Sequence, residues 1–211
     1  MTTRLTRIAL LDAATRLASQ DPDLERILDL FGPPPLWARP AGYATLVRII
    51  LEQQVSLASG RSAFERLTDG ANQVQPEQVL RLGPERIRAR GLTRQKTRYI
   101  IELANAVQDG RIDLRSIGRM EDEQARNALM VTPGIGPWTA NIYLLMALRR
   151  KDVWPVADLA LRKALQQLRG MRRTPTDAAL EKIARRWRPH RSVAARMLWH
   201  YYLCSRRGNR A

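Results

Sequence analysis

Cysteine is almost absent from this 211-residue sequence, in which Cys204 is the only one. A single thiol excludes a disulfide within the chain and any zinc site or iron–sulfur cluster that needs several thiolates. Long apolar runs are missing as well. The N-terminal apolar stretch is interrupted by Asp12 and followed by Arg16, so it predicts an amphipathic helix rather than a signal peptide. No stretch approaches the roughly 18 apolar residues of a membrane span, and we expect a soluble, cytoplasmic protein without a membrane partner.

Acidic residues are scarce relative to basic ones. The chain has 36 Lys and Arg against 20 Asp and Glu, which gives a formal net charge of +16. Lysine occurs only at Lys96, Lys151, Lys163 and Lys182, so arginine carries most of the charge. GC-rich coding alone explains a preference for Arg over Lys, but not the excess of bases over acids. The guanidinium groups suit forked phosphate contacts, and the charge favours a polyanionic partner, nucleic acid before an anionic membrane.

The period-two alternation of strands is missing, whereas apolar residues recur with period 3.6. Asp21 and Pro22 predict a helix start, Gly32 predicts its end, and the prolines of residues 32–40 mark a connector. Further helices are expected over 43–59, 61–68, 76–82, 84–90, 93–110, 122–130, 137–149, 159–168, 176–187 and 191–203. We therefore expect an all-α protein, a compact bundle of about ten helices in two subdomains. One subdomain would join about 1–40 to about 176–211, and the other would span about 41–175.

The stretch VTPGIGPWTAN (131–141) places four helix breakers between two helical patterns: Pro133, Gly134, Gly136 and Pro137. Pro137 suits the first turn of a helix, while both glycines allow positive φ and leave backbone N–H groups uncovered. The pattern predicts a helix, a tight hairpin and a second helix whose N-terminus attracts a phosphate. An ordinary turn between packed helices explains the glycines equally well, and the net charge favours the phosphate.

This hairpin, in LMVTPGIGPWTANIYLLMAL, and the following DVWPVADLALRKAL resemble the helix-hairpin-helix DNA glycosylase superfamily, above all its bacterial 3-methyladenine DNA glycosylase II branch. Three further stretches occur in the family's order and spacing: LVRIILEQQVSLASG (46–60), ARGLTRQKTRYIIELANAV (89–107) and ARRWRPHRSVAARMLWH (184–200). The resemblance implies one glycosylase domain over 1–211, with the hairpin at 131–138 and the active-site cleft between the subdomains. Larger members carry an extra N-terminal β-rich domain, which we expect this chain to lack.

The resemblance implies hydrolysis of the N-glycosidic bond of alkylated purines, of the 3-methyladenine and 7-methylguanine type, in duplex DNA. The sugar gains oxocarbenium character in that reaction, so a carboxylate is needed nearby, and Asp158 falls at the family's catalytic position. Asp158 also suits a helix N-cap, and the two roles are compatible. Strand-cutting members carry Lys where this chain has Trp138, so we expect a monofunctional enzyme that leaves an abasic site. We expect no required cofactor, and the iron–sulfur cluster of many strand-cutting members is excluded.

Trp138 and Trp199 fall at pocket positions of the family, where an indole face attracts a cationic, alkylated base. Core packing is the alternative for both tryptophans. Ile142 and Leu159 stand where well-known members have aromatic rings. This departure leaves the range of accepted bases open and keeps a deaminated or oxidised base as an alternative substrate.

For DNA binding, the resemblance implies contacts from Gly134, Ile135, Gly136 and Thr139 at the hairpin. Gln54 aligns with the side chain that fills the gap left by a flipped base, with Gln53 beside it; a plain surface glutamine is the alternative.

Family hairpins commonly bind a monovalent cation, Na+ or K+, through backbone carbonyls, here those of Met130, Thr132 and Ile135. The expected partner is double-stranded DNA with a damaged base, bound by a monomer. A non-catalytic helix-hairpin-helix DNA-binding protein is the alternative of another class, and it would not need Asp158.

Overall fold

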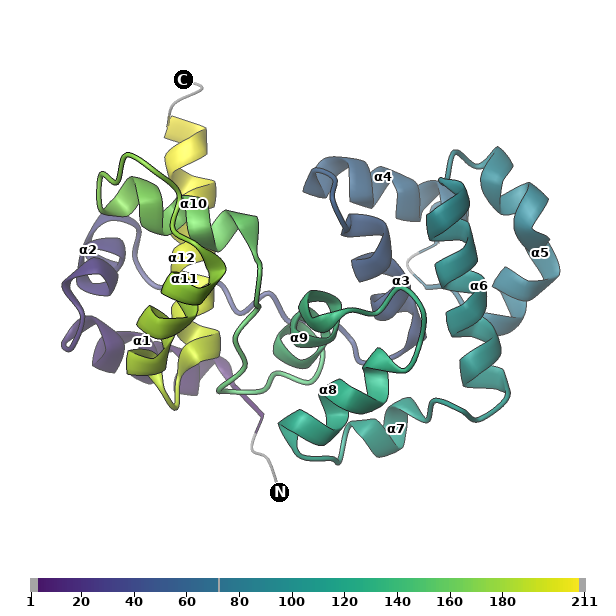
Figure 1. Ribbon diagram of the computed structural model, residues 1–211, viewed down its shortest axis with the longest axis horizontal. Coiled ribbons are helices and arrows are strands. Elements are labelled where there is room, and N and C mark those ends of the chain that lie inside the picture. The colour runs from purple at the N-terminus through teal and green to yellow at the C-terminus, as the bar shows by residue number, and fades with distance from the viewer. Residues whose placement is uncertain (1–3, 72, 209–211) are drawn as a thin grey trace. The chain divides into compact units, whose positions relative to one another are not determined.

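The computed structural model describes residues 4–71 and 73–208. Within these residues it contains twelve α-helices, one 3₁₀ turn and no strand (Figure 1). The prediction of an all-α protein is confirmed. Contacts divide the chain into two units, which we describe separately: unit 1 is Arg39–Leu148, and unit 2 joins the residues before Arg39 to those from Arg149 onward.

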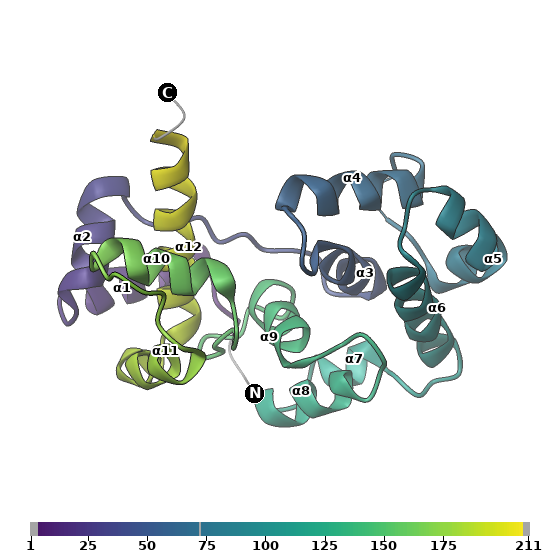
Figure 2. The ribbon, with the colours of Figure 1, turned by 45° about the horizontal axis from the view of Figure 1, so that its top comes forward.

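Unit 1 is built from seven helices. They are α3 (Tyr43–Glu52), α4 (Leu57–Thr68), α5 (Pro76–Ala89), α6 (Arg94–Gln108), α7 (Leu114–Ile117), α8 (Asp122–Met130) and α9 (Pro137–Met146). Helix α3 is the centre of the unit, since it packs on α4, α6 and α9. Leu46, Ile50 and Leu51 on α3 are fully buried, and α9 is buried over most of its length. Helices α5 and α6 lie side by side in both ribbon views (Figures 1 and 2).

The predicted helix over 43–59 is wrong in its length, because α3 ends at Glu52. Gln53 is extended, Gln54 has a φ of +57°, and Ser56 then caps α4 by accepting a hydrogen bond from the backbone N–H of Ser59. The ammonium group of Lys96 donates to the carbonyl oxygen of Leu51 at 2.6 Å and so takes up one of the last acceptors of α3. The Ser56 N-cap and the Lys96 ammonium group, which lies 45 residues from Leu51 in the sequence, thus separate α3 from α4, although the apolar pattern predicts one helix.

The two helices expected over 76–82 and 84–90 form one element, α5, with a kink. Gly83 interrupts it with a φ of +69° and a ψ of 168°, directly before Pro84. Helix α7 has only four residues and was not expected from the sequence, since so short a segment shows no period.

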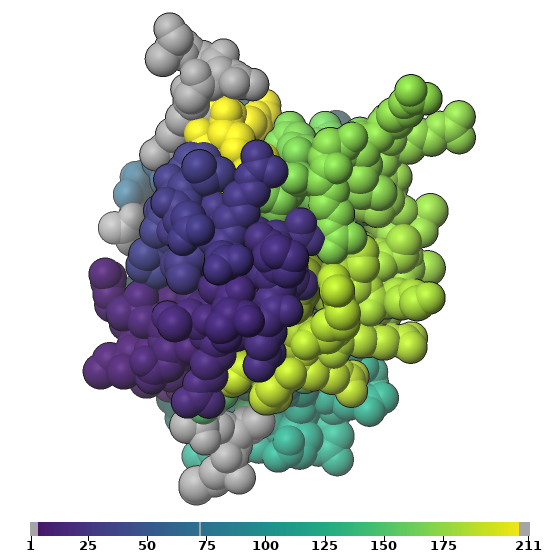
Figure 3. Space-filling model, turned by 90° about the vertical axis from the view of Figure 1, so that its left-hand side faces the viewer, coloured from purple at the N-terminus to yellow at the C-terminus, as the bar shows by residue number. Residues whose placement is uncertain are grey.

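Unit 2 contains α1 (Arg7–Ala18), α2 (Pro22–Phe31), α10 (Leu159–Leu168), α11 (Asp177–Ala184), the 3₁₀ turn η1 (Arg185–Trp187) and α12 (Arg191–Gly208). Helix α12 is its centre and packs on α1, α2 and α10. Figure 3 shows the N-terminal helices, in purple and blue, against the green residues of α10 and α11 on one face. The carboxylate of Asp21 joins these segments, because it caps α2 at the N–H of Asp23 and accepts a 2.8 Å hydrogen bond from Trp187 Nε1.

The expected subdomain boundary near residue 176 lies instead at Leu148–Arg149. Helix α10 packs on α12, and this places residues 149–175 with the terminal helices. Residues 1–3 and 209–211 of the expected domain lie outside the described residues, and the expected cleft between subdomains stays a prediction. In the described part of the chain, no helix combines the length and the apolar character needed to cross a membrane.

Candidate functional site

The hairpin between α8 and α9 is built around one left-handed glycine. Gly134 has a φ of +90°, and a Cβ on it would lie 2.6 Å from Tyr99 Cδ2, so no other residue fits without displacing the ring. Ile135 is 3% exposed, and its N–H donates to the carbonyl of Thr132 at 3.1 Å, which closes the turn. The predicted helix, hairpin and helix are therefore present.

Gly136 differs from what the sequence suggested. Its φ is −88°, so it does not use the positive φ that we expected of both glycines. It is exposed, and no heavy atom lies within 4 Å of where its Cβ would be. No side chain caps α9 at this end, and Pro137 stands in its first turn. Gly136 therefore leaves room for a ligand to approach the backbone at the positive end of α9.

Gln53 and Thr139 hold the hairpin from inside. The side-chain nitrogen of Gln53 donates to the carbonyl of Gly134 at 2.8 Å and to Thr139 Oγ1 at 2.7 Å. Thr139 is 2% exposed, so its hydroxyl faces the interior of unit 1. In the structure both side chains fasten the hairpin to the end of α3, and the DNA contacts expected of them stay a prediction.

Beyond α3, the connection to α4 presents an exposed tip. Gln54 is exposed in a left-handed conformation, which costs a non-glycine residue about 1 kcal/mol or more and is typical of functional segments. Val55 and Leu57 beside it are 46% and 60% exposed. The sequence singled out Gln54 but missed these two apolar residues, which read there as one side of a longer helix.

Asp158 lies in unit 2 at the start of α10. It is 6% exposed, and its Oδ1 accepts hydrogen bonds from the backbone N–H of Leu161 at 3.0 Å and from Trp199 Nε1 at 3.2 Å. The preceding residue, Ala157, has a φ of +60°. The predicted N-cap is therefore present, on a strained turn that brings a carboxylate to the positive end of a helix.

Trp199 on α12 is 7% exposed and serves as a hydrogen-bond donor to this carboxylate. The sequence offered two interpretations, a pocket wall or core packing. The structure adds a third role, since the indole N–H orients the Asp158 side chain. No spacing rule signals a contact between residues 41 positions apart.

The remaining expected pocket residues fall in both units. Trp138 and Ile142 are on α9 of unit 1, the first half-buried and the second 3% exposed. Leu159 begins α10 of unit 2 and is 56% exposed. A base pocket formed by these residues stays a prediction.

The hairpin residues fit the monovalent cation implied by the resemblance. Thr132 is 4% exposed, and its Oγ1 is buried without a hydrogen-bond partner, an oxygen that a cation beside the turn would satisfy. Among residues 4–71 and 73–208, no group of three or more His, Cys, Asp or Glu side chains is placed to hold a metal. The donors implied by the resemblance are the backbone carbonyls of Met130, Thr132 and Ile135, and this cation site stays a prediction.

Helix α6 supplies residues that the sequence did not single out. The Tyr99 ring covers Gly134, Gln95 Nε2 donates to the Tyr99 hydroxyl at 2.8 Å, and the Arg98 guanidinium lies 5.5 Å from the ring centroid. Burial lowers the pKa of Lys96, whose ammonium group caps α3. These side chains support the hairpin and the tip through contacts that only the fold creates.

Comparison with known proteins agrees with this geometry. A family model described as "HhH-GPD superfamily base excision DNA repair protein" matches residues 47–189. The chain is 32% identical over 165 residues to DNA-3-methyladenine glycosylase 2 of Escherichia coli, covering 73% of this chain and 55% of that protein. It is 26% identical over 203 residues to an alkylbase DNA glycosidase-like protein of Schizosaccharomyces pombe, covering 93% and 95%.

Among solved structures, the fold is similar to a 3-methyladenine DNA glycosylase of Schizosaccharomyces pombe in complex with abasic DNA. The TM-score is 0.83 at 27% identity, and the match covers 89% of this chain and 95% of that one. The chain thus spans little more than half of the Escherichia coli relative, at 55%, but nearly all of the two yeast proteins, at 95% each.

Proposed function

We propose, from the premise that this chain belongs to the HhH-GPD superfamily of base excision DNA repair proteins, that it is a monofunctional DNA glycosylase for alkylated purines. It hydrolyses the bond between deoxyribose C1′ and a base of the 3-methyladenine or 7-methylguanine type in duplex DNA. The product is an abasic site in an intact strand.

The observation that carries this proposal is the buried carboxylate of Asp158, held at the positive end of α10 by Leu161 N–H and Trp199 Nε1–H. As the C1′–N bond breaks, its electron pair leaves with the base and positive charge develops on the sugar. Asp158 stabilises that charge or orients the water whose oxygen bonds to C1′ and whose proton is lost. An alkylated, cationic purine leaves as a neutral base, so it needs little protonation.

The absence of lyase chemistry follows from Trp138. The resemblance places a nucleophilic Lys of strand-cutting members at this position, and an indole cannot form a Schiff base. Lys96 on α6 donates its ammonium group to the Leu51 carbonyl.

DNA is held by the backbone at Gly134–Gly136 and by the exposed tip of Gln54, Val55 and Leu57, which fills the space of the flipped base. A Na+ or K+ ion held by oxygens of Met130, Thr132 and Ile135 strengthens the phosphate site, and no other cofactor is required. Because its substrate is DNA, we expect the protein in the cytoplasm, associated with the nucleoid and acting as a monomer.

The test is base release from a methylated duplex by the wild type and by Asp158→Asn. Asn caps helices as well as Asp does, so the variant keeps its fold and its DNA affinity, while base release falls by about 10²-fold or more. Strand breaks should appear only after alkali treatment. Breaks without alkali would show a lyase, and release by the variant at the wild-type rate would remove Asp158 from the mechanism. Tight binding with no release by either protein would indicate a non-catalytic DNA-binding protein.

A further inference from the structure

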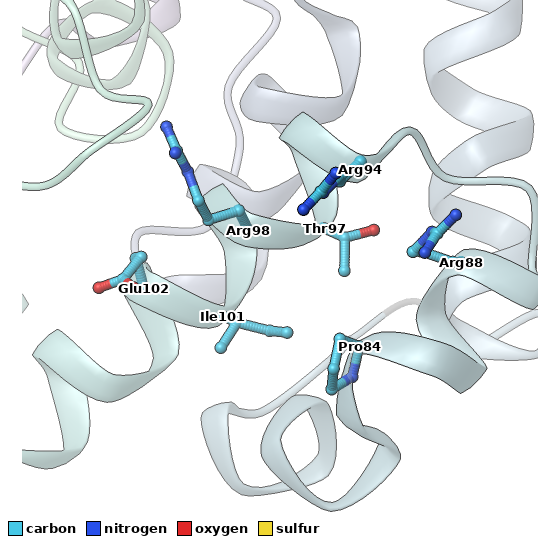
Figure 4. Close-up of a pocket in the computed structure, with 7 residues that line it drawn as sticks. All are labelled: Pro84, Arg88, Arg94, Thr97, Arg98, Ile101 and Glu102. Atoms are coloured by element: carbon cyan, nitrogen blue, oxygen red, sulfur yellow. The ribbon is translucent and has the colours of Figure 1, made fainter.

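A surface hollow of about 270 Å³ lies between α5 and α6 of unit 1 (Figure 4). Helix α5 contributes Pro84 and Arg88 to its lining, and α6 contributes Arg94, Thr97 and Arg98. The sequence indicated no role for any of these five residues, although Arg94, Thr97 and Arg98 lie in the stretch 89–107, and none belongs to the hairpin or to the surroundings of Asp158. The hollow is therefore a separate feature of the surface.

The charge of the hollow is unbalanced. Arg88, Arg94 and Arg98 are exposed, and within the described residues none of the three is paired with an acid. Only one carboxylate lines the hollow, that of Glu102. Three guanidinium groups around one concave site attract an anion, and a forked phosphate contact suits Arg best.

A buried hydroxyl points to the same kind of ligand. Thr97 lines the hollow and is 2% exposed, yet its Oγ1 has no hydrogen-bond partner in the described part of the chain. In Figure 4 this oxygen lies on the side of Thr97 that faces Arg88. A buried hydroxyl normally donates its proton to an acceptor, and a phosphate oxygen is an acceptor that Arg88 and Arg94 would hold beside it.

Helix α6 connects the hollow to the hairpin. Arg98, at the edge of the hollow, stacks on Tyr99, and the Tyr99 ring packs on Gly134. The helix therefore supports the hairpin through Tyr99 and lines the hollow through Arg94, Thr97 and Arg98.

We propose that this hollow binds a second DNA phosphate, on the backbone beyond the phosphate held by the hairpin. Arg88 and Arg94 donate charge-assisted hydrogen bonds to it, and Thr97 donates its hydroxyl. The inference deepens the proposed function and rests on DNA binding, but not on base release. It extends the DNA footprint of unit 1 along α6.

The experiment measures the affinity of the full-length protein for a duplex at several salt concentrations. The logarithm of the association constant falls linearly with the logarithm of the salt concentration. In the variant with Arg88→Gln and Arg94→Gln, this negative slope should become shallower by about 1, since one phosphate contact is lost. Arg86→Gln is the matched control, because Arg86 is exposed on the same helix and does not line the hollow. Its slope should equal that of the wild type.

Thr97→Val separates a built site from bulk charge, since it removes the hydroxyl without changing the charge. We expect weaker duplex binding with a melting temperature no lower than that of the wild type. A double arginine variant with the wild-type slope, or an Arg86→Gln slope that falls as much, would overturn the proposal. So would Thr97→Val with wild-type affinity. A wild type that binds the duplex but releases no base would refute the proposed activity alone, and the slopes would still decide the hollow.

Discussion

At the scale of single residues, Asp158 shows how one side chain serves both the fold and the proposed chemistry. Its position before an apolar helical pattern predicted the N-cap, because capping depends on neighbours within three residues. The hydrogen bond from Trp199 was not predictable, since it joins α10 to α12. The two interactions together restrict the carboxylate to one orientation, and an oriented carboxylate is what an oxocarbenium-like transition state requires.

Trp199→Phe tests this orientation. Removing a hydrogen bond to a charged group costs about 1.5–3 kcal/mol, so base release by enzyme saturated with DNA should slow by roughly 10- to 100-fold. Duplex affinity should change little, which separates positioning from binding. The matched control is Trp187→Phe, because Trp187 is also buried and donates its N–H to a carboxylate, that of Asp21, at 2.8 Å. If both variants slow release per folded molecule equally, Trp199 has no specific link to the reaction.

His190 is a second residue with a measurable consequence. Burial lowers its pKa, Arg16 and Lys151 lower it further, and only Asp152 opposes them. Its Nδ1 is buried without a hydrogen-bond partner in the described structure. A histidine with a depressed pKa in the folded state stabilises the fold above its unfolded pKa of about 6.5, and that contribution is lost as the pH falls through the folded value.

The melting temperature of the wild type should therefore fall more between pH 7 and pH 5 than that of His190→Gln, which cannot be protonated in this range. Thermal unfolding of both proteins at matched ionic strength measures the difference. Equal pH profiles would mean that protonation of His190 is not coupled to unfolding.

At the scale of elements, the hairpin was predictable as a turn but not in its details. Four helix breakers within five residues require a turn between α8 and α9, whatever surrounds them. The left-handed position is Gly134 alone, however, and Tyr99 of α6 is the reason that no side chain fits there. The end of α3 shows the same limit, since an apolar period continues past Glu52 while Ser56 and Lys96 divide the helix. Local patterns predicted these elements, and contacts between elements decided where they end.

Gly134→Ala and Gly136→Ala should therefore have opposite effects. At Gly134 a methyl group combines positive φ with a collision against Tyr99, and strain of about 1–3 kcal/mol lowers the melting temperature by roughly 2–12 °C. At Gly136 the φ is −88° and the space is open, so stability should hold or rise by about 0.4–1 kcal/mol. Duplex affinity should nevertheless fall for Gly136→Ala, because the methyl group obstructs the approach of a phosphate. Thermal unfolding and duplex titration of both variants distinguish the roles, and a destabilised Gly136→Ala with normal affinity would contradict them.

At the scale of the whole molecule, features that extend over the entire chain predicted more than local motifs did. The all-α class follows from the period of 3.6 that recurs along the chain, and the polyanionic partner follows from the net charge of +16. The division into units was harder, because residues 149–175 carry no sign that α10 packs on α12. Asp158 belongs to unit 2, whereas Gly134, Gln54 and the arginine hollow belong to unit 1. The proposed chemistry and most of the proposed DNA contacts thus rest on different parts of the chain.

This separation predicts two different responses to salt. Binding of an undamaged duplex depends on exposed arginines. If the protein makes six or more phosphate contacts, raising the salt concentration from 50 to 200 mM should lower its duplex affinity by about 10³-fold or more. Release of an alkylated base from DNA that is saturated with enzyme depends instead on Asp158, which is 6% exposed and screened little by ions. Single-turnover rates at saturating protein should therefore stay nearly constant over the same range. A rate that falls with salt in parallel with affinity would place exposed charges in the chemical step, and Asp158 alone could not then account for catalysis.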